Sequence, residues 1–142
     1  MDSVQATPPS PEDTDVLLSL PDTPHDDPQR GLLTYVLQHR ARFEQPAIAL
    51  LEQSLGCEEP PIRGFRAFYL ASLLGEWRSR RAAPTLVDWL GTPWGFGGGE
   101  LVTAITRVGG ATVEPLLLVL FDPAASLRSR RRAARALASV GV

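Results

Sequence analysis

The chain of 142 residues has 44% hydrophobic residues and a net charge of −2, a balance that suits one packed domain with a tail. All of its 14 basic residues are arginine, which excludes a P-loop lysine, a Schiff-base lysine and a lysine general base. Its single cysteine, Cys57, excludes an internal disulfide and fits a reducing compartment, so we expect a cytoplasmic protein.

The N-terminal 30 residues differ in composition from the rest of the chain. Residues 1–30 hold six of the 13 prolines, and their seven acidic residues face one arginine, whereas residues 31–142 carry more arginines than acidic residues. Because proline removes a backbone donor and disfavours helix in the residue before it, we predict that residues 1–30 form a disordered acidic tail. The exception is the run TDVLLSL at 14–20, a candidate short helix. It is a collapsed remnant, docks on the first repeat, or is a short linear motif for another protein.

Residues 31–142 show a repeating pattern of two short helices. Pro46, Pro84 and Pro115 each precede an apolar run, and proline is favoured in the first turn of a helix because its missing N–H needs no partner there. Upstream of each proline lies another segment with helical apolar spacing, at 32–37, 65–74 and 101–108. The prolines are 38 and 31 residues apart, a period typical of helical repeats, and a fourth copy begins at Arg128.

Alignment on the three prolines predicts which positions are equivalent. It matches the apolar residues Val36, Leu74 and Ile105, and the turn residues Arg40, Arg78 and Gly109. From the helical period we expect these apolar residues to face the interior: Leu33, Val36, Leu37, Ile48, Leu51, Leu55, Leu101, Ala104, Ile105, Val108, Ala133, Ala134, Leu137 and Val140. We expect Trp77 and Trp89 to belong to the same packing.

Two stretches of the chain resemble HEAT repeats, in particular the short repeats of phycobilisome lyase HEAT-like proteins: ASLLGEWRSRRAAPTLVDWL and TAITRVGGATVEPLLLVLFD. The shared pattern is Leu-Gly, a short polar turn and then A-x-P-x-L, which matches at Leu74, Gly75, Ala82 and Pro84 and less fully at Ile105, Val108, Gly109, Val113 and Pro115. The resemblance covers about residues 31–142 and implies an all-α solenoid of about three and a half stacked antiparallel helix pairs. It implies a scaffold and brings no catalytic residue. The family association also points to a lyase-type chaperone or subunit, although the sequence shows no bilin site.

The glycine-rich segment at 91–99 carries two large aromatic residues, Trp94 and Phe96. Glycine loops that cradle phosphate lie between a strand and a helix, whereas this segment follows a helical pattern in a chain without lysine, so we do not expect nucleotide binding. Two hypotheses remain: the aromatic side chains fold back on the repeats, or they form a contact loop with aromatic anchors for a partner.

Arginines form the strongest charged feature of the sequence. Four of them are spaced i, i+3, i+4 and i+7 and so share one stripe of the last helix: Arg128, Arg131, Arg132 and Arg135. Six more lie in predicted turns within the repeats, and because equivalent turns stack in a solenoid they predict a basic ridge: Arg40, Arg42, Arg78, Arg80, Arg81 and Arg107. The ridge is a solvated surface, a site for an acidic protein or a site for nucleic acid, and a further hypothesis has the acidic tail lie on it in cis.

The sequence shows no catalytic or metal-binding constellation. His25, His39 and Cys57 are too isolated to form a ligand set, and no Ser-His-Asp, HExxH or CxxC arrangement occurs. Three carboxylates could line a groove, although carboxylates in helical repeats are usually surface charge: Asp88, Glu100 and Glu114. We therefore predict no enzyme, no cofactor and no metal site.

The sequence as a whole predicts a non-catalytic protein–protein interaction scaffold, with polyanion or nucleic-acid binding through the arginines as the alternative. The candidate partner-binding residues are Trp94, Phe96, Arg78, Arg80, Arg81, Arg128, Arg131, Arg132 and Arg135. Because a repeat buries its apolar face against the next one, we expect Leu137 and Val140 to lie at an open C-terminal edge, which belongs to a longer array or meets a partner or a second copy. No segment approaches the roughly 20 apolar residues of a membrane span, and the N-terminus lacks a signal-peptide pattern, so we expect no membrane contact.

Overall fold

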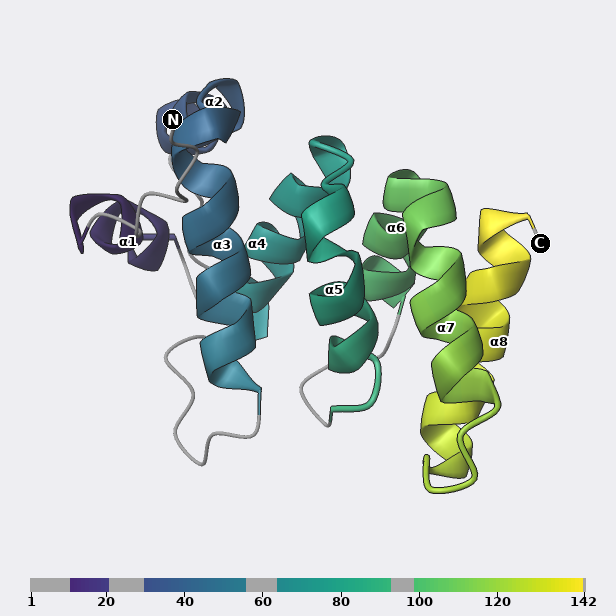
Figure 1. Cartoon of the computed structure of the whole chain (residues 1–142). Coiled ribbons are helices and arrows are strands. Elements are labelled where there is room, and N and C mark those ends of the chain that lie inside the picture. The colour runs from purple at the N-terminus through teal and green to yellow at the C-terminus, as the bar shows by residue number, and fades with distance from the viewer. Residues whose placement is uncertain (1–10, 21–29, 56–63, 93–98, 142) are drawn as a thin grey trace, which may run out of the picture.

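The computed structural model describes residues 11–20, 30–55, 64–92 and 99–141, and every element in these ranges is a helix, which confirms the all-α prediction. Figure 1 shows the elements in chain order. They are α1 (Pro11–Leu18), α2 (Arg30–Gln38), α3 (Arg40–Ser54), α4 (Gly64–Glu76), α5 (Ala83–Trp89), α6 (Gly99–Val108), α7 (Val113–Leu120) and α8 (Leu127–Val140). Two short 3₁₀ helices, η1 (Arg80–Ala82) and η2 (Gly109–Thr112), lead into α5 and α7.

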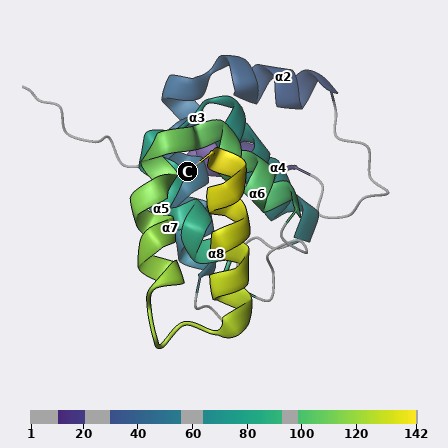
Figure 2. The same ribbon diagram turned by 90° about the vertical axis from the view of Figure 1, so that its right-hand side faces the viewer.

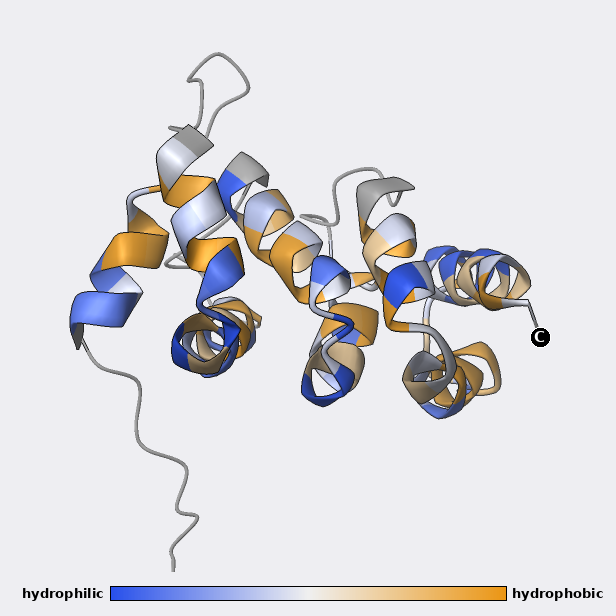
Figure 3. Cartoon of the chain, turned by 90° about the horizontal axis from the view of Figure 1, so that it is seen from above, coloured by the Kyte–Doolittle hydropathy of each residue, from blue (hydrophilic) through white to orange (hydrophobic). Residues whose placement is uncertain are grey.

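The helices from α3 onwards lie in two rows, which Figure 3 shows from above. In one row α4 packs against α6 and α6 against α8, and in the other α3 packs against α5 and α5 against α7. Contacts of α3 with α4, of α5 with α6 and of α7 with α8 join the rows, and Figure 2 shows α7 and α8 side by side. The chain therefore alternates between the two rows from one helix to the next.

The helix pairs α4–α5 and α6–α7 repeat the same arrangement. The buried residues of their first helices correspond at a spacing of 31 positions: Leu70 with Leu101, Leu74 with Ile105 and Trp77 with Val108. The second helices match less closely, since Val87 is buried and its counterpart Leu118 is exposed. Pro84 and Pro115 lie in the first turns of α5 and α7, as the sequence predicted. The chain has a positive φ at equivalent places in the two turns, 51° at Arg78 and 80° at Gly109. Backbone and burial therefore confirm the predicted equivalence of these positions.

The first helix pair departs from the predicted pattern. Pro46 lies inside α3, which begins at Arg40, and so it does not open the second helix of a pair. The turn is a single residue, His39, and Arg40 does not share the positive φ of Arg78, so the predicted equivalence of these two arginines is wrong. Proline removes one hydrogen bond from a helix interior. The buried side chains of α3, which include Pro46 itself, hold the helix together across that gap.

Most residues that the helical period placed in the interior are buried or half-buried, with two exceptions. Leu37 is 41% exposed because α2 packs sparsely against α3, and Ala134 is exposed on α8. Trp77 and Trp89 are buried as expected. The indole N–H of Trp77 donates to the carbonyl oxygen of Leu37 at 2.9 Å, and that of Trp89 donates to the carbonyl oxygen of Leu51 at 3.1 Å. Both tryptophans thereby join the α4–α5 pair to the preceding pair.

The candidate helix in the N-terminal tail is formed and packed. α1 lies against α3, and Leu17 and Leu20 are fully buried. The guanidinium of Arg66 donates to the carbonyl oxygen of Leu20 at 2.7 Å. The docking alternative therefore describes the run 14–20, because two buried leucines offset the ordering cost of the short helix, and the helix begins three residues before that run, at Pro11. Residues 1–10 and 21–29 lie outside the described part of the chain.

The last helix is covered better than the sequence indicated. α8 begins at the cap Ser126, whose hydroxyl oxygen accepts from the backbone N–H of Ser129 at 3.0 Å, and it ends at Gly141 with φ 96°. Leu137 of α8 is buried, so the prediction that it lies at an open edge is wrong. It is buried because α8 packs against both α6 and α7. The apolar side chains that do project are at the other end of α8 and on α7: Leu118, Phe121 and Leu127.

One stretch is long and apolar enough, by length and composition alone, to cross a membrane. It is Leu101–Leu120, with a mean hydropathy of 1.3, and it corrects the expectation that no segment reaches that length. In the fold these residues belong to α6, η2 and α7, and Figure 1 shows the chain reversing direction between α6 and α7. The stretch is therefore two antiparallel helices here.

Candidate partner-binding groove

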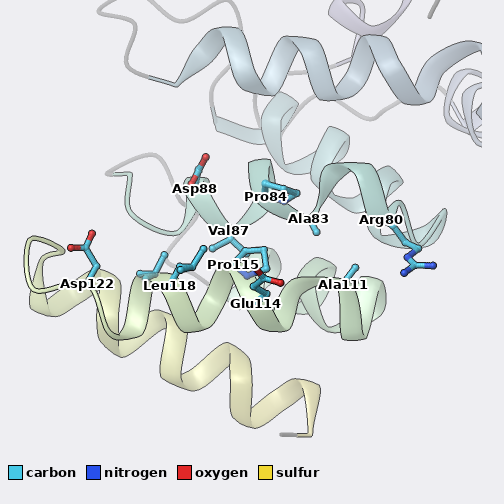
Figure 4. A pocket seen from close by; sticks show the side chains of 11 residues that line it. Arg80, Ala83, Pro84, Val87, Asp88, Ala111, Glu114, Pro115, Leu118 and Asp122 are labelled. Atoms are coloured by element: carbon cyan, nitrogen blue, oxygen red, sulfur yellow. The ribbon is translucent and has the colours of Figure 1, made fainter. Parts of the chain in front are cut away.

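A groove of about 500 Å³ lies between α5 and α7, in the row that also contains α3 (Figure 4). Its lining combines apolar residues with four charged ones: Arg80, Ala83, Pro84, Val87, Asp88, Ala111, Glu114, Pro115, Leu118, Val119 and Asp122. The alanines and the two prolines of this lining project only short side chains into the space between α5 and α7. The groove therefore lies where equivalent helices of two successive pairs, each with a proline in its first turn, face each other.

The charges of the groove are separated along its length. Figure 4 shows Arg80 at one end and Asp122 at the other, with Asp88 on the rim above. Partial burial raises the pKa of Asp88, and the nearby carboxylate of Glu52 raises it further. Asp88 and Glu114, for which the sequence left a place in a groove as the alternative to plain surface charge, both line this groove. The side chain of Glu100 lies outside the described part of the structure.

A second hollow, of about 770 Å³, adjoins the turn between α4 and α5. It is lined by residues of that turn and by the first residues of α3: Arg40, Ala41, Glu44, Gln45, Trp77, Arg78, Arg80 and Arg81. We call this the turn hollow. Burial on its own would raise the pKa of Glu44, but hydrogen bonds from Arg40 and Ser79 lower it below the ordinary value. Glu44 is therefore held ionised within a surface that is otherwise positive.

Three of the six arginines predicted to form a basic ridge have carboxylate partners. Arg40 pairs with Glu44 at 3.1 Å, Arg42 pairs with Asp13 of α1, and Arg107 pairs with Glu76. The other three are exposed and lie together at the turn hollow: Arg78, Arg80 and Arg81. The positive surface is thus concentrated at one turn instead of forming a continuous ridge. Asp13 also shows that the acidic tail meets one ridge arginine in cis.

The arginines of α8 do not all share one free stripe. Arg128, Arg131 and Arg135 are exposed, whereas Arg132 donates to the carbonyl oxygen of Leu90 at 2.8 Å, at the C-terminal end of α5. The predicted four-residue stripe is therefore wrong at Arg132. Its side chain is drawn inwards because the last carbonyl groups of a helix need donors.

The remaining candidates carry no site in the described residues. Trp94 and Phe96 lie in the segment 93–98, outside the described part of the chain, as do His25 and Cys57. The described residues, His39 included, contain no group of three His, Cys, Asp or Glu side chains that could hold a metal ion. The Nδ1 of His39 lies 2.7 Å from the carbonyl oxygen of Tyr35, within the same turn.

Sequence reasoning missed the apolar floor of the groove. Ala83, Val87, Ala111 and Leu118 received no role, although the alignment on Pro84 and Pro115 already placed their helices in equivalent positions of successive pairs. The signal was the repeat itself, because equivalent helices of neighbouring repeats lie side by side. Comparisons with protein families, with curated proteins and with solved structures found no match to this chain.

Proposed function

We propose that this protein is a non-catalytic protein-binding scaffold of the α-solenoid type, and that it holds a segment of another protein in the α5–α7 groove. The observation that carries the proposal is the groove itself, which has an apolar floor and charged ends. An apolar cleft with a few charged groups at its rim matches the recognition of peptide segments, where apolar side chains provide affinity and charges set register.

Support for a solenoid comes from the two helix rows and from the buried positions that recur at a spacing of 31 residues between α4 and α6. In solenoids each repeat contacts its neighbours, and the aligned helices of one row provide an extended binding surface. The α5–α7 groove lies between equivalent helices of two successive pairs, where such a surface is expected. That the solenoid is of the HEAT type is part of this proposal and rests on the resemblance of the sequence to HEAT repeats.

A protein partner fits the groove better than a polyanion. Asp88, Glu114 and Asp122 surround most of the groove and would repel phosphate groups. Arg42 and Arg107, which were expected to extend the positive surface along the repeats, are paired with carboxylates. A nucleic acid needs a longer positive track than one turn supplies.

The proposal is tested by selecting displayed random peptides on the full chain and measuring the affinity of the synthetic winners. Leu118 and Phe121 form a matched pair of exposed apolar residues at the end of α7, but only Leu118 lines the groove. We expect Leu118→Glu to weaken peptide binding about tenfold and Phe121→Glu to leave it within about twofold. Failure to select any peptide, or equal losses in the two variants, would contradict the proposal.

A further inference from the structure

We propose that the partner segment has an acidic end and a basic end, and that the acidic end binds in the turn hollow while the basic end lies at Asp88 and Asp122. This inference rests on the proposed function, because it assumes that the middle of the segment occupies the α5–α7 groove. It adds the chemistry of the partner and the direction in which the partner lies.

The groove and the turn hollow, which together we call the track, adjoin each other at Arg80. This residue lines both of them, at the end of the groove that faces the α4–α5 turn. A segment that leaves the groove past Arg80 therefore reaches the turn hollow by passing over η1, which begins at that residue. The opposite end of the track is closed by Asp122, where α7 ends.

The turn hollow carries an excess of positive charge, because four arginines line it and Glu44, which attracts Arg81 as well as Arg40, is the one carboxylate among its lining residues. No ion pair within the described ranges involves Arg78, Arg80 or Arg81. The carboxylate of Glu44 is already engaged, because Arg40 and the hydroxyl of Ser79 both donate to it. Like charges at such close spacing repel one another, so an anionic group in the hollow gains both attraction and relief of that repulsion.

Arg78 is placed at the hollow at a conformational cost. Its φ of 51° is in the left-handed region, where a side chain is disfavoured, and the equivalent position of the next turn is Gly109. A glycine at position 78 would make the same turn without strain. Strained residues gather at binding sites when the surrounding structure holds them there, and an arginine at this position adds a charge to the hollow that glycine could not supply.

The opposite end of the track is acidic. Asp88 and Asp122 lie there, and Glu52 of α3 faces Asp88 closely enough to disfavour its charge. A lysine or arginine of the partner would offset this repulsion and would favour the ionised form of Asp88. Glu114 lies between the two ends (Figure 4), so the track is complementary to a segment with separated charges and a mainly apolar centre. A nucleic acid, which is negative throughout, fits only the turn hollow.

The experiment uses one peptide with an acidic end, an apolar centre and a basic end, together with two variants in which both ends are acidic or both are basic. We expect the peptide with opposite ends to bind about fivefold more tightly than either variant at low salt, and the preference to shrink as salt screens the charges. The direction in which the bound peptide lies is then measured with paramagnetic labels attached to its two ends. A label on the acidic end should broaden the amide signals of Ser79 and Arg81, and a label on the basic end should broaden that of Asp122.

Two substitutions in identical sequence contexts provide the control. Arg81 and Arg131 are both the last residue of an RSRR tetrapeptide, and both are exposed, but only Arg81 lines the turn hollow. We expect Arg81→Ala to weaken binding of the peptide with opposite ends about threefold or more and Arg131→Ala to leave it unchanged.

The two proposals fail in different ways. If the three peptides bind equally and Leu118→Glu abolishes binding of all three, the inference about charge is wrong and the groove remains the site. If the labels show the acidic end at Asp122, the proposed direction is wrong. If neither these peptides nor displayed random peptides bind, the proposed function itself is overturned.

Discussion

The helix pairs α4–α5 and α6–α7 both have a residue of positive φ at the equivalent place between their helices, but that residue differs. In the first turn the backbone N–H of Arg78 bonds to the carbonyl oxygen of Gly75, and the N–H of Ser79 bonds to that of Leu74, both at 3.0 Å. This pairing ends a helix through a left-handed residue, a position that glycine usually occupies. The second turn has Gly109 there. The fold therefore needs a left-handed residue at this place, and the first turn adds a positive charge that the fold does not need.

A second comparison shows how strongly the flanking residues decide which local structure a short sequence adopts. The tetrapeptide RSRR occurs at 78–81, where it makes a turn, and at 128–131, where it lies within α8. In both places the serine is buried and hydrogen-bonded, to Glu44 in the first case and to the cap Ser126 in the second. The flanking residues choose between the two structures: Ser126 opens a helix, while the packed end of α4 closes one.

The largest effect is expected from the equivalent core positions of the two pairs. Leu74 and Ile105 are both fully buried. We predict that Leu74→Ala and Ile105→Ala each lower the free energy of unfolding by about 2 to 5 kcal/mol, because each removes buried methyl groups and leaves a cavity. Urea denaturation measures both. If one substitution lowers the free energy of unfolding by an amount outside this range while the other stays within it, the two helix pairs are not packed alike.

A close approach of helices gives the next prediction. A Cβ on Gly75 would lie 3.0 Å from the Cα of Ala104, so α4 and α6 must separate to admit it. We predict that Gly75→Ala destabilises the fold by about 1 kcal/mol or more, because overpacking outweighs the gain in helix propensity. Gly31→Ala is the control, since a Cβ there meets nothing within 4 Å, and it should stabilise slightly. A stabilising Gly75→Ala would contradict the packing.

Substitutions at Arg78 and Gly109 test whether the two turns place equivalent demands on the backbone. Gly109→Ala puts a side chain at a φ of 80° and should cost about 1 to 2 kcal/mol, although the added Cβ meets no atom within 4 Å. Arg78→Gly should have the opposite sign and stabilise by about 1 kcal/mol, because it removes the same strain from the equivalent turn. Thermal unfolding of both variants provides the measurement, and changes of equal sign would contradict the equivalence.

The smallest effect concerns pH. Burial raises the pKa of Asp88, so ionised Asp88 disfavours the folded state, and the stability that the protonated group provides is lost as the pH rises through the raised value. Asp88→Asn should therefore raise the melting temperature at neutral pH. The gain should vanish below the ordinary pKa of an aspartate, where both states hold the proton. A gain that is independent of pH would assign the effect to something other than ionisation.

Much of the two regular pairs followed from local sequence signals. The positions of Pro84 and Pro115 predicted the starts of α5 and α7, and apolar spacing predicted the burial of Leu74 and Ile105. These signals worked because proline geometry and helical periodicity act within a few residues. The same rule failed at Pro46, because helix propagation through residues 40–45 and packing of α3 outweighed the local preference of proline.

The rest depended on contacts between distant parts of the chain. The docking of α1, with Asp13 on Arg42, joins residues 29 positions apart, and composition alone indicated disorder there. The inward turn of Arg132 depends on the carbonyl group of Leu90, which no local pattern reveals. One long-range pair did have a signal: Glu76 and Arg107 occupy equivalent positions 31 residues apart, and repeats bring equivalent positions together.

Stability and binding measured on one variant, Arg78→Gly, test most directly whether the fold needs only a left-handed residue at this turn while the arginine serves the partner. We expect this variant to have a higher melting temperature than the wild type and about threefold or greater loss of affinity for the peptide with opposite ends. A variant that gains stability and binds the peptide as tightly as the wild type would contradict the claim that the arginine at this turn is there for binding.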